Sequence, residues 1–335
     1  MEEREGMMKV LSPWIQVTNR CNLHCNYCFV NQNSLDMSEE VYNNINDTFF
    51  RLLDEGKVER VVYRVAGGEP LLVFDKCKNF MKEFLTRKNT FIEIDTNLLL
   101  LNDEIEDFFI AYKDRIHISV SVDGFKYSKP GVEKSEEVRA KIERLVKRGF
   151  SSISISTVIE QEAFEDLEKL AEWVAENGFH WGVNLDHYCR YTLSETQVID
   201  KMYQVIDILY ERSYNIVDNF LFNGVKLNGT NGCMAGHSIF AIDASGKIFP
   251  CHTLIGKEPV GDITQKDFLK ELHIQCKYAI GNNYRLPEDC VECPLLKYCD
   301  GGCKLHSTEE TRKYSCKIVK SVVLYTLETI MKEKE

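Results

Sequence analysis

The cysteines of this 335-residue chain constrain its fold and chemistry most, because they fall into two sets with short, regular spacings. The first set lies in residues 21–28, which read CNLHCNYC, and the second lies between residues 233 and 316. The chain has 13 cysteines in all. In an exported protein such a set would form disulfides, whereas in a reducing compartment tight clusters of this kind indicate bound metal.

Composition favours the reducing compartment. The N-terminal residues MEEREGMMKV are acidic, and no apolar run reaches the ~18 residues of a membrane span, so we expect neither a signal peptide nor a membrane anchor. We expect a cytoplasmic protein. The net charge is −11 with no block of Lys or Arg, which argues against nucleic acid as a partner.

Residues 1–212 show a repeating pattern in which β-branched runs alternate with longer amphipathic stretches. Two of the helical stretches, 136–148 and 164–176, end just before a glycine, as helices commonly do. Six β–α repeats predict an α/β fold with a parallel sheet, curled into a partial (β/α)6 TIM-like barrel or left open. The six predicted strands are Trp14–Thr18, Val61–Val65, Phe91–Asp95, Ile116–Ser121, Ser152–Val158 and Trp181–Leu185.

Residues 213–335 differ in character, with shorter elements and more turn residues and cysteines. Ile239–Asp243 and Lys247–Pro250, separated by Ala-Ser-Gly, predict a hairpin. A final helix is predicted from about Lys317 to Lys332. We therefore expect two domains, the barrel and a small cysteine-rich α+β domain appended to it.

The loop with Cys21, Cys25 and Cys28 directly follows the first predicted strand. Three cysteines leave one iron of a [4Fe-4S] cluster free to bind a substrate or cofactor. A structural zinc site would be closed by a fourth ligand, which His24 could supply. The spacing of these residues leaves both kinds of site open.

This loop resembles the Cys-x3-Cys-x2-Cys loop of the radical S-adenosylmethionine (SAM) superfamily, in which an aromatic residue, here Tyr27, precedes the last cysteine. Further motifs of that superfamily follow in order, each after a predicted strand. They are Gly67-Gly68-Glu69-Pro70, Thr96-Asn97 and Ser121-Val122-Asp123-Gly124. All lie at the carboxyl ends of strands, where barrel sites assemble.

The resemblance implies a [4Fe-4S] cluster on the three cysteines and S-adenosylmethionine bound by the motifs. The glycines would let the backbone approach the methionine moiety, and Glu69 or an exposed backbone edge would meet its ammonium. Asn97 and Ser121 lie where the family contacts the ribose. Two departures stand out: the family's glycine after Thr-Asn is Leu98, and a common arginine is missing, for which Lys134 and Arg139 are the candidate substitutes.

The second cysteine set resembles the SPASM domain of peptide and anaerobic sulfatase maturases, whose spacing it matches at all seven cysteines. By that resemblance, one auxiliary [4Fe-4S] cluster would be held by Cys290, Cys293, Cys299 and Cys316. A second would be held by Cys233, Cys251 and Cys303. A zinc ribbon is the alternative for the paired cysteines. The second cluster is one ligand short, so either Cys276 completes it or one iron is open, and we favour the open iron.

Two residues are candidates for the chemistry on the substrate. His252 follows Cys251 at the position where sulfatase maturases carry an aspartate, and an unperturbed imidazole titrates near neutrality. Cys189 follows the sixth predicted strand and is a candidate hydrogen donor. The plainer interpretation of His252 is a solvent-facing histidine, and that of Cys189 is a buried apolar residue. Cys77, in a predicted helix, is expected to be a buried apolar residue.

The resemblance implies an enzyme that uses a 5′-deoxyadenosyl radical to abstract hydrogen and oxidatively modify, most plausibly cross-link, a ribosomal peptide or protein side chain. It implies three [4Fe-4S] clusters and a flavodoxin- or ferredoxin-type reductant. One alternative is a small-molecule enzyme such as a haem-precursor decarboxylase, which the lack of a domain before residue 14 would favour. The other is a non-catalytic iron–sulfur or zinc protein.

Overall fold

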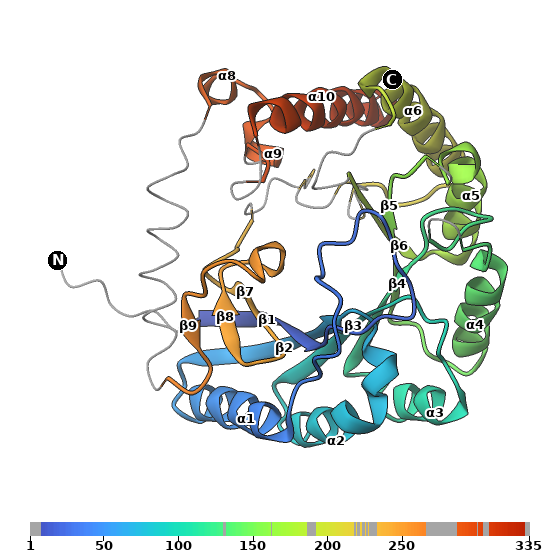
Figure 1. Cartoon of the computed structure of the whole chain (residues 1–335). Coiled ribbons are helices and arrows are strands. Elements are labelled where there is room, and N and C mark those ends of the chain that lie inside the picture. The colour runs from blue at the N-terminus through green and yellow to red at the C-terminus, as the bar shows by residue number, and fades with distance from the viewer. Residues whose placement is uncertain are drawn as a thin grey trace.

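A computed structural model gives the fold (Figure 1). A single sheet of nine strands forms its centre, with the order β6-β5-β4-β3-β2-β1-β7-β8-β9. The helices lie around the outside of this sheet in Figure 1. The structure describes residues 8–129, 132–161, 163–185, 192–217, 219, 222, 225, 227, 233–265, 287–299, 301–303 and 308–331.

The first six strands are parallel to one another, as the β–α alternation predicted. They are β1 (Met8–Thr18), β2 (Val58–Gly67), β3 (Thr90–Thr96), β4 (Ile116–Ser121), β5 (Ile153–Val158) and β6 (His180–Asn184). The sheet order starts at β6 and ends at β9, so the sheet formed by the described strands is open. The predicted partial (β/α)6 barrel is confirmed.

Helices cover the outer face of this barrel, because the strand residues on that face are apolar. Tyr63 of β2, for example, is fully buried and stacks on Phe84, with 3.4 Å between ring centroids. The helices are α1 (Glu39–Asp54), α2 (Phe74–Phe84), α3 (Asp103–Ala111), α4 (Ser135–Lys147), α5 (Leu167–Asn177) and α6 (Glu195–Glu211). The 3-10 turns η1 (Pro70–Val73) and η2 (Phe164–Asp166) precede α2 and α5. Within the described residues no helix is long and apolar enough to cross a bilayer.

The C-terminal region continues the same sheet. The predicted hairpin is confirmed as β7 (Ile239–Ile242) and β8 (Lys247–Phe249), and β7 pairs in parallel with β1. The two predicted domains therefore share one sheet, and the boundary at residue 212 stays a prediction. Short elements follow: η3 (His252–Leu254), β9 (Gly261–Asp262), α8 (Glu288–Val291) and α9 (Leu296–Cys299).

The last helix, α10 (Glu309–Met331), begins eight residues before the predicted Lys317. Thr308 caps it by accepting a hydrogen bond from the Thr311 amide, a signal that the hydrophobic pattern does not carry. Helix α10 packs on α6, where Tyr325 stacks on Tyr203 with 4.0 Å between ring centroids. Figure 1 shows the pair side by side at the top of the view. This contact holds the C-terminal region against the barrel.

Candidate functional site

The loop after β1 carries Cys21, Cys25 and Cys28 and runs along the concave side of the sheet in Figure 1. A tight turn shapes it, in which the Cys28 amide donates to the Cys25 carbonyl at 3.1 Å. Burial, with smaller contributions from the charges of Glu69, Cys25 and Cys28, raises the pKa of the Cys21 thiol to about 11. The three thiols therefore lie near enough to affect one another electrostatically.

Thiolates are the ligands of iron–sulfur clusters, so the donor set of this loop fits such a group. Each thiolate of a four-iron cluster binds its own iron, and the three sulfurs need only face a common space. In the described part of the chain, no three His, Cys, Asp or Glu side chains are grouped so that they could hold one metal ion.

Gly67 and Gly68 bring the end of β2 against the backbone that leads into the cysteine loop. The Gly68 amide donates to the Thr18 carbonyl at 2.8 Å, and the Glu69 amide donates to the Arg20 carbonyl at 2.9 Å. A Cβ atom on Gly68 would lie 2.0 Å from the Arg20 carbonyl oxygen, and one on Gly67 would lie 2.4 Å from that of Thr18. The glycines thus permit the loop to approach the end of β2 closely.

Glu69 is buried, and its carboxylate is held by three donors on neighbouring segments. It accepts hydrogen bonds from Thr96 Oγ1 at 2.6 Å, from the Asn97 amide at 2.8 Å and from the Leu71 amide at 3.0 Å. Burial raises its pKa to about 7, and these hydrogen bonds limit the rise. The side chain therefore links the ends of β2 and β3.

Asn97 connects the end of β3 to the cysteine loop, since its side-chain amide donates to Asn22 Oδ1 at 2.9 Å. The next residue, Leu98, is fully buried and has a φ of 59°. That left-handed conformation explains why a glycine suits this position. Ser121 lies half-buried at the end of β4, opposite Ser156 of β5. The strand ends thus bring Asn97 and Ser121 to the same edge of the sheet as the cysteine loop.

Lys129 is a buried cation of this site that the sequence analysis missed. Its Nζ donates to the Tyr27 hydroxyl at 2.6 Å and to Asp123 Oδ1 at 3.2 Å. The Tyr27 hydroxyl in turn donates to Asp123, which also accepts from the Val158 amide at 2.9 Å. Burial raises the pKa of Cys25, and the charge of Lys129 opposes that rise.

The two predicted substitutes for the missing arginine differ in their surroundings. Lys134 is exposed and pairs with Glu137 at 3.9 Å. Arg139 donates to Ser135 Oγ at 2.8 Å and stacks on Phe125, 3.7 Å from the ring centroid. The role of these two residues as substitutes for the arginine stays a prediction, and Lys129 is a further candidate cation. The signal that could have found it is a lysine six residues after Asp123, in a turn.

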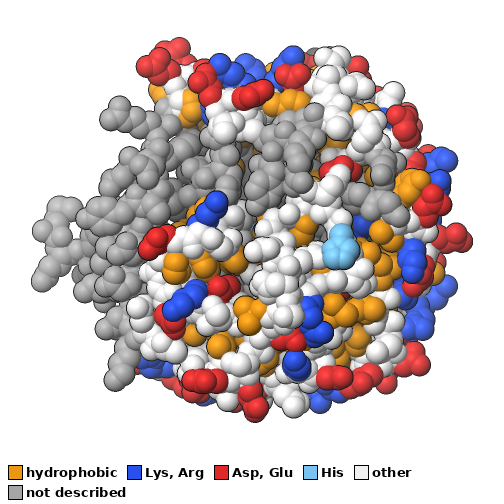
Figure 2. All heavy atoms as spheres, in the orientation of Figure 1, with side chains coloured by type: hydrophobic (Ala, Val, Ile, Leu, Met, Phe, Trp, Pro, Cys, Tyr) orange, Lys and Arg blue, Asp and Glu red, His pale blue; other side chains and the backbone are white. Residues whose placement is uncertain are grey.

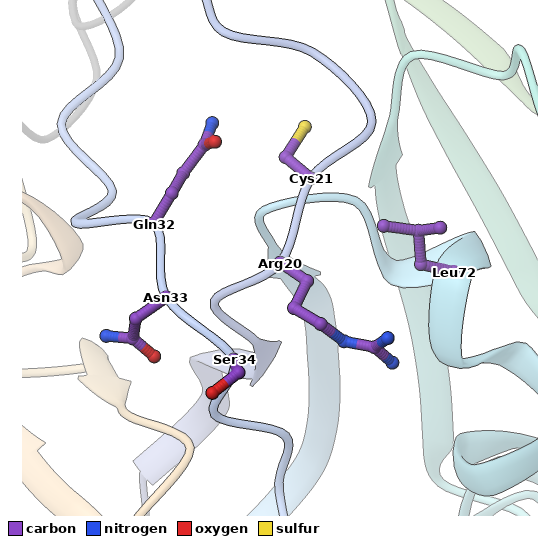
Figure 3. A pocket seen from close by; sticks show the side chains of 6 residues that line it. All are labelled: Arg20, Cys21, Gln32, Asn33, Ser34 and Leu72. Carbon is purple, nitrogen blue, oxygen red and sulfur yellow. The ribbon is translucent and has the colours of Figure 1, made fainter.

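We call this set the strand-end site: Cys21, Cys25, Cys28, Tyr27, Gly67, Gly68, Glu69, Asn97, Ser121, Asp123 and Lys129. A surface pocket of about 440 Å³ opens beside it. Figure 3 shows Arg20 and Cys21 on one stretch of the loop, with Gln32, Asn33 and Ser34 on the stretch beside it and Leu72 across the pocket. Cys21 is thus reached from the surface.

The C-terminal cysteines fall into two groups in space. Burial raises the pKa of Cys251, and the nearby Cys233 and Cys303 add to the rise. Burial likewise raises the pKa of Cys316, to which Cys299 and Cys293 contribute. Cys290 interacts with Cys316 and Cys299 in the same way, and Arg312 Nη1 lies 3.9 Å from its sulfur. The assignment of these cysteines to two auxiliary clusters stays a prediction.

His252 lies in an aromatic contact between the two cysteine regions. Its ring centroid is 5.3 Å from that of Trp14 in β1 and 5.1 Å from that of Phe29, the residue after Cys28. Its role as a base is untested and stays a prediction. Cys77 is buried in α2, as expected. Cys189, the other catalytic candidate, and Cys276 lie outside the described residues.

An open parallel barrel with a three-cysteine loop at its strand ends defines the architecture of an iron–sulfur enzyme that binds S-adenosylmethionine. Residues 15–174 match the model of the radical SAM superfamily. The GGEP-bearing strand end and the cysteine loop both lie within this match.

Three comparisons extend over most of the chain. The radical SAM cyclopropyl synthase TigE of Paramaledivibacter caminithermalis is 22% identical over 86% of this chain, which spans 66% of that relative. The cysteine-type anaerobic sulfatase-maturating enzyme of Clostridium perfringens is 24% identical, with 85% of this chain and 86% of the relative covered. A solved structure of anSMEcpe with bound AdoMet and a Cp18Cys peptide has a TM-score of 0.74 at 20% identity, covering 96% of this chain and 98% of the other. That likeness establishes the fold.

Proposed function

We propose that this chain is a radical SAM maturase that oxidatively modifies a side chain of a ribosomal peptide or a protein. The observation that carries the proposal is the strand-end site, where hydrogen bonds hold a three-cysteine loop against the ends of β2, β3 and β4. When bound to a [4Fe-4S] cluster that has been reduced, S-adenosylmethionine would supply a 5′-deoxyadenosyl radical, which would abstract hydrogen from the substrate.

Each part of the site has a separate task in this proposal. Cys21, Cys25 and Cys28 hold the cluster and leave one iron for the cofactor. The backbone after Gly68 meets the cofactor's ammonium, because the Glu69 carboxylate is already engaged. Lys129 attracts the cofactor's carboxylate, since a buried cation with a donor to spare suits an anionic group. Asn97 and Ser121 remain our candidates for the ribose, and Tyr27 for packing on the cofactor.

The C-terminal cysteines would hold two auxiliary [4Fe-4S] clusters, which gives three in the chain. The support is the electrostatic proximity of Cys251 to Cys233 and Cys303, and that of Cys290 and Cys316 to Cys299. These clusters would accept an electron from the substrate radical, or would bind the substrate. His252 is our candidate for a base that takes a proton from the substrate, and Cys189 is our candidate for a hydrogen-atom donor. A reducing compartment such as the cytoplasm suits so many thiolates.

A peptide or protein is the substrate class that we infer, and a cross-link is the product. Anaerobic sulfatase maturation is the named activity of one relative, and anSMEcpe was solved with a peptide. The sheet formed by the described strands is open, which leaves its concave side accessible to an extended peptide.

The pocket beside Cys21 is where we expect the reductant to approach. Arg20 and Lys76 both pair with Asp36 next to this pocket, at 2.9 and 2.7 Å, which leaves a net positive charge on the trio. Flavodoxins and ferredoxins are acidic, so this charge would steer one of them towards the cluster. Elsewhere on the face drawn in Figure 2, acidic and basic side chains are mixed along the rim.

The test replaces Cys21, Cys25 and Cys28 with alanine and measures release of 5′-deoxyadenosine under dithionite. We expect release to fall below detection while about eight of about twelve irons remain, because the auxiliary clusters are separate. Cys77→Ala, a cysteine of α2 away from the loop, is the matched control and should keep both. Continued release of 5′-deoxyadenosine by the triple variant would overturn the proposal. About four irons with stoichiometric zinc in the reconstituted wild-type protein would refute the auxiliary clusters.

A further inference from the structure

The inner face of the sheet carries charged residues that the proposed chemistry does not use. On the outer face of the central strands, Tyr63 and Ile94 are buried, at 0% and 1% exposure. On the inner face, the side chains of Arg64, Glu93 and Asp95 keep 30%, 24% and 30% exposure. These strands are the middle of the sheet, and helices cover their other face (Figure 1). The exposure therefore reports open space on the concave side.

These side chains form one connected group. Arg64 Nη2 lies 2.9 Å from Glu93 Oε1 and 3.9 Å from Asp95 Oδ1. Asp95 Oδ2 accepts a hydrogen bond from the indole of Trp14 at 3.2 Å. Trp14, Arg64 and Glu93 are neighbours in strand register across β1, β2 and β3. We call Trp14, Arg64, Glu93 and Asp95 the inner carboxylate site.

The charges of the inner carboxylate site do not balance. Two carboxylates face one guanidinium, so the group has a net charge of −1 when both are ionised, and burial together with the charge of Glu93 raises the pKa of Asp95 although Arg64 opposes the rise. The neighbour in register, His117, adds no cation, because burial lowers its pKa and its ring bonds to Ser152 and Ser154 at 3.1 and 2.8 Å. An additional positive group would complete the site.

Unpaired polar atoms beside the site point to the same kind of ligand. Gln16, two residues beyond Trp14 on the same face of β1, is 2% exposed, yet its Oε1 accepts no hydrogen bond from the described residues. Arg64 Nε is a buried donor that likewise lacks a partner among them. Buried polar atoms left unpaired are costly. A ligand that brings both an N–H group and a carbonyl oxygen would satisfy the two atoms.

We propose that the inner carboxylate site binds the side chain of a Lys or Arg residue of the peptide substrate. This inference rests on the proposed function and adds the specificity of the site. Asp95 lies two residues before Asn97, about 7 Å below the strand ends at about 3.3 Å per residue. The long stem of a basic residue spans such a depth while the peptide backbone stays beside the strand-end site. The ammonium or guanidinium then balances Glu93 and Asp95, and the peptide's amide groups meet Gln16 and Arg64.

The experiment selects random octapeptides on the immobilised, anaerobically reconstituted enzyme with S-adenosylmethionine, and sequences those retained. We expect Lys or Arg to be enriched at one position. For the best peptide, replacing that residue with norleucine should weaken binding about 30-fold in fluorescence anisotropy. The double variant Glu93→Gln with Asp95→Asn should bind both peptides alike. Glu59→Gln, an exposed carboxylate of the same strand as Arg64, is the control and should keep the difference.

Retained peptides without a basic preference, or a double variant that still distinguishes lysine from norleucine, would overturn the inference. Single variants Glu93→Gln and Asp95→Asn provide the same comparison if the double variant does not fold. Release of 5′-deoxyadenosine without peptide is measured on each protein. Normal release together with loss of the lysine preference supports the inference, whereas normal release with no preference in the wild type refutes it and leaves the radical chemistry standing.

Discussion

The strand-end site and the C-terminal cysteine region present the same thiol chemistry in very different surroundings. In the first, the buried carboxylates of Glu69 and Asp123 accept hydrogen bonds from four separate segments, and Lys129 is buried beside them. In the second, Cys233 and Cys303 are exposed, and the helices α8 and α9, which carry Cys290 and Cys299, have four residues each. Among the residues that the structure describes, the first loop is therefore held by more buried polar contacts than the second region.

The difference indicates which interactions stabilise the structure of each region. Isolated helices shorter than about 12 residues are marginal in water, so α8 and α9 need other interactions to persist. Cys290 and Leu295 are the residues of 287–299 that are buried. Metal ligation contributes directly to folding where the protein core is small. We therefore infer that the auxiliary clusters organise the C-terminal region, whereas the strand-end site is organised before its cluster is bound.

Removing iron should show the largest contrast between the two regions. After anaerobic chelation, we expect backbone amides of residues 287–303 to exchange hydrogen at least tenfold faster, because their cross-links are gone. Amides of β2, β3 and β4 should change less than twofold. Hydrogen-exchange mass spectrometry of the reconstituted and chelated protein measures both. Equal loss of protection in the two regions would contradict the inferred difference.

Asp123→Ala should give the next largest effect, now on the strand-end site. The substitution leaves the Lys129 ammonium buried without its carboxylate, which costs about 3–5 kcal/mol of folding free energy. The measurement is the shift of the urea unfolding midpoint under anaerobic conditions. Lys134→Ala, at an exposed lysine on the same segment, is the control and should change the midpoint little.

The double variant Asp123→Ala with Lys129→Met sharpens this test. Removing the charge together with its partner should recover a large part of the lost stability, since the uncompensated ion is the main cost. A double variant no more stable than Asp123→Ala would mean that Lys129 and Asp123 are not coupled. The strand-end site would then owe its order to Glu69 alone.

The six barrel strands were predictable to within a few residues at most of their ends, because alternating burial of β-branched residues is a local signal. The exception is β1, which begins at Met8, six residues before the predicted Trp14. The strand-end motifs also followed from their order along the chain. The role of Lys129 did not, because it arises from a turn in which the Asp123 amide donates to the Ser128 carbonyl at 3.0 Å. The position of Cys316 inside α10 was likewise hidden until Thr308 was seen to start that helix.

The inner carboxylate site illustrates the same limit on prediction. Glu93 and Asp95 occupy the polar positions of an alternating strand, which a sequence assigns to solvent. Their meeting with Arg64 and Trp14 depends on the register between β1, β2 and β3 and on the open side of the sheet. No local pattern contains that register, so the site emerges only from the assembled fold.

Leu98→Gly should produce the smallest change in stability. The sign of that change shows whether backbone strain or side-chain packing dominates at this position of the strand-end site. Glycine would relieve a φ of 59°, a strain of about 1–2 kcal/mol, but would remove a fully buried leucine worth about 2–5 kcal/mol. We expect a net loss of about 2 kcal/mol, measured as a shift of the urea midpoint. The barrel would tolerate this loss, and iron bound by the cysteine loop should be unchanged, because Asn97 keeps its contacts with Glu69 and Asn22 through its own amide groups. A gain in stability would show instead that the backbone strain outweighs the packing of Leu98, and that this chain retains leucine there for a reason other than stability.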